Sequence, residues 1–77
     1  MSVKYIVFDY NIPVLFPDYA VHAEVASEMK DRYGDPTSAG FVARNADGTF
    51  SAYGESTSLD IKSDPKRDSQ LITRMMS

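Results

Sequence analysis

The stretch VKYIVFDY, residues 3–10, decides the fold of this chain. β-Branched and aromatic side chains dominate the stretch, and only Lys4 and Asp9 carry a charge. Such a run is typical of a strand that is largely buried. A chain of 77 residues has the length of one domain, so we treat residues 1–77 as a single domain that contains this strand.

A second short strand is expected at residues 12–16, after the turn residue Asn11. Pro13 lacks an amide donor, so it belongs at a sheet edge or at the start of this strand. The two strands are expected to form a hairpin.

A helix is predicted over residues 19–33. Asp18 can accept hydrogen bonds from the free amides of the first turn, and its charge suits the positive end of the helix dipole. Gly34 is expected to end the helix in a left-handed conformation. Apolar residues recur every four positions along the helix, at Val21, Val25 and Met29.

Two further strands, residues 37–44 and 49–56, flank an Asn-Ala-Asp-Gly turn that ends in Gly48. Glycine supplies the positive φ that a bulged hairpin loop requires. Gly40 and Gly54 interrupt the two strands, and each indicates a bulge or a place where another segment packs against bare backbone.

The last helix is expected to start with Asp64 as its cap and Pro65 at its first position. Its apolar side chains lie in the final two turns, so the first turn is expected to stay polar. Before it, apolar and polar residues alternate over residues 57–62, which indicates that the preceding strand continues or that a fifth strand begins.

The elements run β-β-α-β-β-α, which predicts an α+β domain with a small antiparallel sheet and two helices packed on one face. The predicted core takes large apolar side chains from every element: Ile6, Phe8, Val14, Phe16, Val21, Val25, Met29, Phe41, Phe50, Leu59, Ile61, Leu71, Ile72 and Met75.

The composition excludes several classes of protein. No cysteine is present, which excludes a disulfide framework and a thiolate metal site. The chain shows no signal-peptide pattern and no apolar run long enough to span a membrane. We therefore expect a cytoplasmic protein without a membrane partner.

Charge is unevenly distributed along the chain, whose formal net charge is −3. No base stands between Lys4 and Lys30, whereas residues 62–77 hold 4 bases and 2 acids, a balance of +2. Non-specific nucleic-acid binding needs several bases on one face, and the overall acidic balance argues against it. Ordinary surface charge remains the alternative interpretation of this distribution.

The chemical motifs indicate no catalysis. His22 is the only histidine, so a zinc or copper site would have to rely on carboxylates, and we expect His22 at the surface or at its boundary. The stretch GESTS at residues 54–58 lacks the second glycine of a nucleophile elbow. We predict that the protein is not an enzyme and uses no cofactor or metal.

The aromatic residues point to binding instead, because the chain has 5 tyrosines and no tryptophan. Tyrosine is enriched among the residues that dominate protein interfaces, although these tyrosines could equally cover the edges of a small core. The candidate protein-binding residues come from the base-free segment and from the second hairpin, and which of the two forms the binding face is left open. They are Asp9, Tyr10, Asp18, Tyr19, Glu24, Glu28, Tyr53 and Glu55.

The succession of KYIVFD (4–9), PVLFPD (13–18), SAGFV (38–42) and YGES (53–56) resembles small uncharacterised proteins carried by phages and prophages. Proteins of that kind include anti-CRISPR inhibitors, which are commonly small, acidic, non-enzymatic binders of a host defence complex. The resemblance implies a bacterial host and a protein partner, and it assigns no site residue.

The leading hypothesis is therefore a non-catalytic acidic module, an anti-CRISPR-like inhibitor that binds a basic surface of a host nucleic-acid-handling complex. No direct contact with nucleic acid is expected. The alternative is a structural or self-assembling protein that forms a homodimer through an exposed sheet edge.

Overall fold

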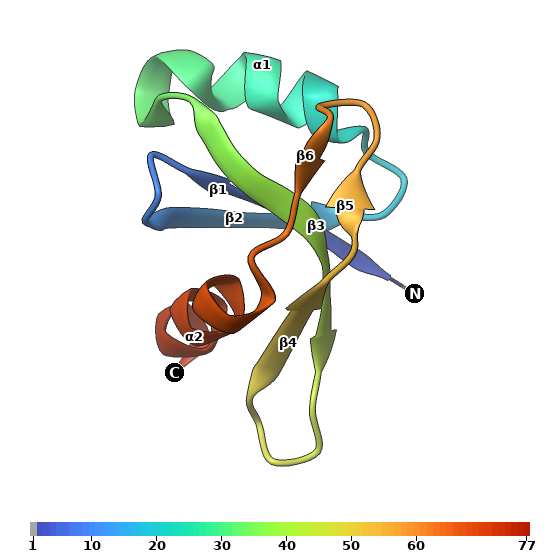
Figure 1. Ribbon diagram of the computed structural model, residues 1–77, viewed down its shortest axis with the longest axis vertical. Helices are drawn as coiled ribbons and strands as arrows, with labels where there is room; N and C mark the ends of the chain where they lie inside the picture. Colours follow the sequence, from blue (N-terminus) through green and yellow to red (C-terminus); the bar gives the residue numbers. More distant parts are fainter. Residues whose placement is uncertain (1) are drawn as a thin grey trace.

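The computed structural model describes residues 2–77, which form two helices, a four-stranded antiparallel sheet and a two-stranded ribbon (Figure 1). This confirms the α+β class. The elements follow in the order β1 (Val3–Phe8), β2 (Ile12–Pro17), α1 (His22–Tyr33), β3 (Pro36–Arg44), β4 (Phe50–Tyr53), β5 (Glu55–Ser56), β6 (Ile61–Lys62) and α2 (Pro65–Met76). The alternation at 57–62 left open whether a fifth strand begins there. The structure has a separate strand at this point, β6, which pairs antiparallel with β5 to form the ribbon.

Strand β1 lies inside the sheet, whose order is β2-β1-β3-β4. Four consecutive side chains, from Tyr5 to Phe8, are no more than 1% exposed. Successive side chains of a strand point to opposite faces of the sheet. Strand β1 is therefore buried on both faces, and each face needs an element to cover it.

The two helices cover opposite faces of the sheet, so the expectation that both pack on one face is wrong. Ile6 and Phe8 pack with residues of α1, whereas Tyr5 and Val7 pack with Ile72 of α2. In Figure 1 the helices lie apart, with strands of the sheet between them. The physical reason is that both alternating sets of side chains in β1 are apolar, and one helix can cover only one of them.

The first hairpin turns at Asp9 and Tyr10 rather than at Asn11. Both residues have positive φ, 50° and 63°, and the amide of Asn11 donates to the carbonyl of Phe8 at 3.2 Å. Positive φ at both central residues matches the twist of a tight hairpin, although Asn and Gly are the usual occupants.

Helix α1 begins at His22, later than the predicted start at Tyr19. The preceding residues form a turn instead, in which the amide of Ala20 donates to the carbonyl of Pro17 at 3.1 Å. Asp18 therefore does not cap the helix, and its carboxylate accepts from the amide of Ser2 at 3.2 Å.

A residue far along the chain partly replaces the missing cap. The N-cap residue Val21 makes no side-chain hydrogen bond to the helix. The hydroxyl of Ser58, in the β5–β6 turn, accepts from the amide of Ala23 at 3.1 Å. One of the free amides of the first turn is thus satisfied by the ribbon, which ties β5–β6 to α1.

Most predicted core residues are buried or partly buried, with two exceptions. Val21 is 41% exposed because it precedes α1, and Met75 in the last turn of α2 is 45% exposed. The prediction also omitted Tyr5 and Val7, which are fully buried on the α2 side of β1.

The second hairpin follows the prediction at its turn, but the strand predicted at 49–56 ends at Tyr53, and Glu55–Ser56 forms β5 of the ribbon instead. The turn of the hairpin ends in Gly48 with φ of 88°. A Cβ at Gly40 would overlap the carbonyl oxygen of Tyr53, and Gly54 lies with φ of 77° against the ring of Phe41. Both glycines thus mark close approaches between β3 and the end of β4, as their positions in the strands indicated.

Helix α2 starts as predicted, with Pro65 in the first turn and the Asp64 carboxylate accepting from the amide of Arg67 at 3.4 Å. Its first turn, however, is not wholly exposed. Asp68 is only 1% exposed and accepts from the hydroxyls of Tyr5 at 2.5 Å and Ser38 at 3.0 Å. It also accepts from the amide of Asp64 at 3.0 Å.

Both edges of the sheet are protected. At the β4 edge, hydroxyls of α2 accept from outward amides: Thr73 from Phe50 at 2.9 Å and Ser69 from Ala52 at 2.8 Å. Along the edge strand β2, backbone amides point alternately toward β1 and outward. Pro13 and Pro17 both stand at outward positions, where proline is tolerated because its missing donor would not bond to β1. Leu15 is then the only outward amide of β2.

Candidate protein-binding surface

A row of four side chains crosses the whole sheet on the α1 side. Lys4 of β1 pairs with Phe16 of β2 and with Phe41 of β3, and Phe41 pairs with Tyr53 of β4. The rings of Phe41 and Tyr53 stack with their centroids 5.8 Å apart. The row ends in an exposed aromatic ring, because Tyr53 is 47% exposed.

His22, the first residue of α1, is packed on this row. Its ring stands edge-to-face with Phe16 and Phe41, at centroid distances of 5.2 and 6.0 Å. Its Nε2 lies 3.0 Å from the carbonyl oxygen of Gly40, which can only accept, so Nε2 carries the proton. With 4% exposure, His22 is a core residue, and the expectation of a surface or boundary position is wrong.

Burial lowers the pKa of His22 below its ordinary value, and the positive charge of Lys4 lowers it further. Hydrogen bonds with the backbone of Gly40 and of Tyr5 oppose this shift. Because burial disfavours the charged imidazolium, the neutral ring is the form that fits between the two phenylalanines.

The loop before His22 is fixed to the same row and exposes its own aromatic ring. The ammonium group of Lys4 donates to the carbonyl of Ala20 at 2.9 Å. Tyr19, one residue earlier, is 83% exposed, and Val21 is 41% exposed. A large aromatic side chain that buries little of its own surface is available for contact with another molecule.

Acidic side chains accompany these rings. Asp18 lies in the loop and Glu24 follows it in the first turn of α1, both exposed, and Glu55 follows Tyr53 across Gly54. The opposing charges at this end are those of Lys4, which is engaged with Ala20, and of Lys62, which pairs in register with Glu55. We call this end the Tyr19–Tyr53 surface, defined by Asp18, Tyr19, Val21, Glu24, Tyr53 and Glu55.

The structure brings together some of the predicted binding residues and separates others. Five of them are exposed residues of the two segments that Lys4, Phe41 and His22 connect: Asp18, Tyr19 and Glu24 in and after the loop, and Tyr53 and Glu55 at the end of the second hairpin. Glu28 lies one helical turn further along α1, also exposed. The base-free segment and the second hairpin, treated as alternatives from the sequence, thus contribute to one end of the molecule.

Asp9 and Tyr10 lie at the other end of the first hairpin. In its register Val3 pairs with Pro17 and Phe8 with Ile12, so the turn at Asp9 and the loop at Asp18 are separated by the length of β1. Six residues of strand span roughly 17 Å at about 3.3 Å per step. Asp9 and Tyr10 therefore do not form one patch with Asp18 and Tyr19.

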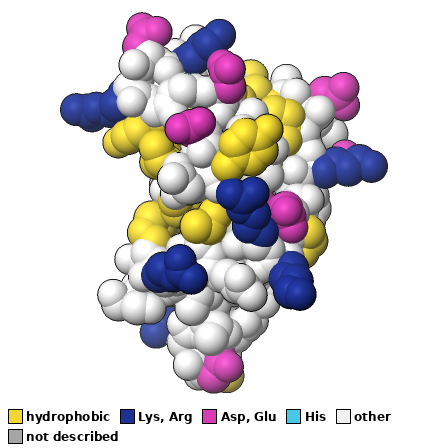
Figure 2. All heavy atoms as spheres, turned by 60° about the vertical axis from the view of Figure 1, so that its left-hand side comes forward, with side chains coloured by type: hydrophobic (Ala, Val, Ile, Leu, Met, Phe, Trp, Pro, Cys, Tyr) yellow, Lys and Arg dark blue, Asp and Glu magenta, His cyan; other side chains and the backbone are white. Residues whose placement is uncertain are grey.

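The Tyr10 end has mixed charge. The guanidinium of Arg67 donates to the carbonyl of Tyr10 at 2.6 Å and lies 5.5 Å from the centroid of its ring. Figure 2 shows the face that carries the left-hand side of Figure 1, where basic and acidic side chains are interspersed around hydrophobic ones. Charges of one sign do not gather on this face.

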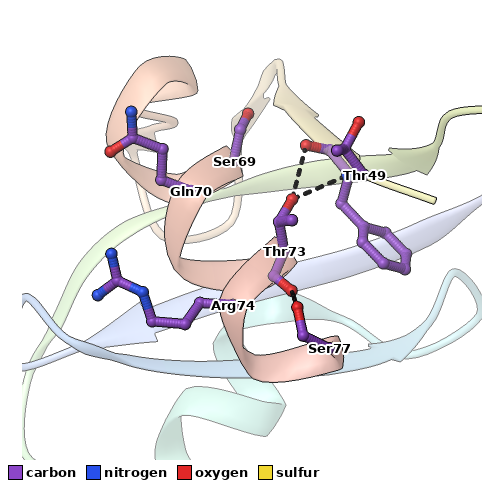
Figure 3. Close-up of a pocket in the computed structure, with 7 residues that line it drawn as sticks. Thr49, Ser69, Gln70, Thr73, Arg74 and Ser77 are labelled. Atoms are coloured by element: carbon purple, nitrogen blue, oxygen red, sulfur yellow. Dashed lines mark hydrogen bonds between the residues drawn. The ribbon is translucent and has the colours of Figure 1, made fainter. Parts of the chain in front are cut away.

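A hollow of about 520 Å³ lies between α2 and β4 but does not form a convergent site. The Thr73 hydroxyl is engaged with the backbone of Phe50, and Ser69 accepts from Ala52. In Figure 3, Gln70 and Arg74 extend away from Thr49 and Thr73. The polar groups that line this hollow are thus committed to the fold or directed elsewhere.

Within residues 2–77, no group of three or more His, Cys, Asp or Glu side chains is placed to hold a metal ion. No helix in that range is long and apolar enough to cross a membrane. Comparison of the chain with protein-family models, curated proteins and solved structures found no match.

Proposed function

We propose that this protein is a non-catalytic acidic module that binds a basic surface of another protein through its Tyr19–Tyr53 surface. The observation that carries the proposal is the 83% exposure of Tyr19 on a loop that Lys4 holds in place. A rigid, exposed tyrosine contributes large contact area at low entropic cost, which is why tyrosine is frequent among interface hot spots.

Electrostatics favours a basic partner. Asp18 and Glu24 are exposed in and just after the loop that carries Tyr19, Glu55 is exposed two positions after Tyr53, and Lys4 is partly buried against the loop. Acidic side chains at the rim of an interface steer encounter with a positively charged partner and act mainly on the association rate. A basic surface that normally holds phosphates is a partner of this chemistry, which is consistent with the proposal of an anti-CRISPR-like inhibitor of a host nucleic-acid-handling complex.

The sheet edges favour this function over self-assembly through an exposed strand. Strand addition needs a row of unpaired amides and carbonyls. The amides of Phe50 and Ala52 on the β4 edge are occupied by α2 hydroxyls, and the β2 edge carries two prolines.

The test uses the immobilised protein and a lysate of a bacterial host, with bound proteins quantified by mass spectrometry. Tyr19→Ala and Tyr53→Ala should reduce recovery of the main captured protein. Tyr10→Ala is the matched control, because Tyr10 is also an exposed tyrosine, at 61%, but lies at the opposite end of the first hairpin. Circular dichroism should confirm that all three variants are folded.

The purified partner then allows a kinetic test. Removing a tyrosine that acts as a hot spot costs about 2 kcal/mol, so Tyr19→Ala should weaken binding about thirtyfold, mainly through faster dissociation. Glu24→Lys should instead slow association and flatten its dependence on salt. Binding that survives Tyr19→Ala and Tyr53→Ala but is lost with Tyr10→Ala would place the interface at the other end and refute the proposal.

A further inference from the structure

We propose that His22 is a proton-sensitive latch, which holds the loop 17–21 and the first turn of α1 on the sheet when its ring is neutral and releases them when the ring is protonated. The closure of the ring's environment, the signs of the charges around it and the position of His22 in the chain support this proposal.

The ring occupies a buried slot in which the groups that act on it, apart from the Lys4 ammonium, are uncharged backbone groups of Gly40 and Tyr5. Phe16 and Phe41 stand on its two sides, and Nε2 already donates to Gly40. The ring is 4% exposed, so water cannot solvate an imidazolium there. Burying such a charge without an opposite charge beside it is costly, and the alternative is for the ring to leave the slot.

The charged and titratable groups around the ring do not compensate a positive charge. From β1, the Lys4 ammonium has the same sign as a protonated ring and lowers the pKa of His22, whereas a hydrogen bond with the backbone of Tyr5 raises it. The residues of β2 and β3 that touch the ring are Phe16, Phe41 and Gly40, and none of them carries a charge. On α1 itself the acidic residue of the first turn is Glu24, but the amino-terminal dipole opposes a cation at the position of His22.

The segment that the latch would release is only lightly attached elsewhere. Helix α1 has no side-chain cap at Val21, and its first turn is held from outside by Ser58 at Ala23. The loop is held by Lys4 at Ala20 and by the contact of Asp18 with Ser2. Loss of the His22 anchor therefore removes the one buried side chain within residues 17–23.

The sign of the pH dependence follows from proton linkage. The folded state disfavours protonation of His22 and the opened state does not, so opening takes up a proton. The latch is then fully closed above the ordinary histidine pKa of about 6.5, and it weakens as the pH falls below that value. One proton per opening event changes the equilibrium by at most about tenfold per pH unit.

The consequence for binding rests on the proposed function. Tyr19 and Val21 lie on the released segment, so acidification would disorganise half of the Tyr19–Tyr53 surface while leaving Tyr53 on the sheet. The latch itself is tested without any partner, so its failure and a failure of the proposed function are separate results.

Hydrogen exchange followed by mass spectrometry between pH 7.5 and pH 5 tests the latch on the whole chain. Protection factors, corrected for the intrinsic pH dependence of exchange, should fall up to about tenfold per pH unit for amides of residues 20–25 below pH 6.5. Amides of α2 and β4 serve as the internal reference and should keep their protection.

Two variants separate the latch from general acid sensitivity. His22→Gln keeps a donor for the Gly40 carbonyl, and His22→Phe keeps a planar ring, but neither side chain titrates in this range. Either variant that folds should show protection of residues 20–25 that does not change between pH 7.5 and pH 5. The proposal is overturned if wild-type protection of this segment stays constant on acidification, or if it falls equally in these variants.

Discussion

Asp68 shows how strongly one residue can tie this fold together. Its side chain is 1% exposed, and its carboxylate accepts from Tyr5 of β1 and from Ser38 of β3. It also accepts from the amide of Asp64, the residue that precedes α2. Burial raises the pKa of the Tyr5 hydroxyl, and the hydrogen bond to Asp68 raises it further, so this hydroxyl remains a donor at neutral pH. A buried carboxylate with several donors is stabilising only while all of them are present.

Asp68→Ala should lower the free energy of unfolding by about 3 kcal/mol or more, because each buried donor left without an acceptor costs about 1–3 kcal/mol. Urea denaturation measures this loss. Asp31→Ala is the control, since Asp31 is exposed and its removal should change stability by less than about 0.5 kcal/mol. If Tyr5→Phe costs as much in the Asp68→Ala background as in the wild type, the two side chains are not coupled and the network is assigned wrongly.

Gly40 and Gly48 are required for different reasons, and substitution of each by alanine distinguishes the two. A Cβ at Gly40 would overlap the Tyr53 carbonyl, whereas Gly48 has open space around it but φ of 88°. Gly48→Ala should cost about 1–2 kcal/mol for the left-handed conformation, and Gly40→Ala should cost more, because the sheet must shift. Thermal denaturation of the two variants gives the order, and an equal or smaller loss for Gly40→Ala would contradict the close approach of β3 and β4.

At the scale of the element, helix α2 acts as the cover of an edge strand. Ser69 and Thr73 lie one turn apart and accept from alternate amides of β4, the positions at which a neighbouring strand would bond. The hollow in Figure 3 is the outer side of this seam. The arrangement prevents the edge from pairing with another molecule.

The double variant Ser69→Ala/Thr73→Val should therefore uncover the edge. We expect a loss of about 2–4 kcal/mol in unfolding free energy, from two unpaired amides, and a concentration-dependent increase in mass by light scattering. Gln70→Ala on the exposed side of the same helix should change neither quantity. A double variant that remains monomeric at high concentration would show that the hydroxyls do not protect this edge.

The local patterns in the sequence predict the elements better than they predict where the elements lie. The Gly48 turn and the start of α2 depend on residues close together in the chain, so their identities suffice. The start of α1 does not, because a turn at Pro17 and the hydroxyl of Ser58 replace the cap that Asp18 was expected to supply. The apolar residues of β1 indicate that both faces of the sheet need a covering element. The local sequence does not indicate which helix packs on which face.

The candidate site shows the same division at the scale of the whole molecule. Its residue types, exposed tyrosines beside acids, could be read from the sequence. Its assembly could not, because Tyr53 joins Tyr19 through the register of four strands and through His22, whose acceptor Gly40 lies 18 residues away. The sequence places Asp9, Tyr10 and Asp18 in one base-free segment, but a hairpin puts its turn and its far end at maximal separation.

The two cores should unfold together, because β1 belongs to both. Ile6 on the α1 side and Ile72 on the α2 side are each 0% exposed. Ile6→Val and Ile72→Val should each lower the free energy of unfolding by about 0.5–1.5 kcal/mol. Circular dichroism and tyrosine fluorescence should report one coincident transition in both variants. Two separate transitions would show that each helix and its face form an independent unit.

The contact between Tyr5 and Asp68 also sets the order in which this chain can be completed. The two residues are 63 positions apart, and the ribosome makes β1 first and α2 last among these elements. Until α2 is available, the inner strand has one uncovered face, and the hydroxyls of Tyr5 and Ser38 lack their acceptor. Folding that depends on such distant partners is slow compared with local helix formation and exposes the unfinished sheet meanwhile. The native state is therefore reached only after synthesis of α2, and nascent chains that stop before it are the species most exposed to chaperones and proteases.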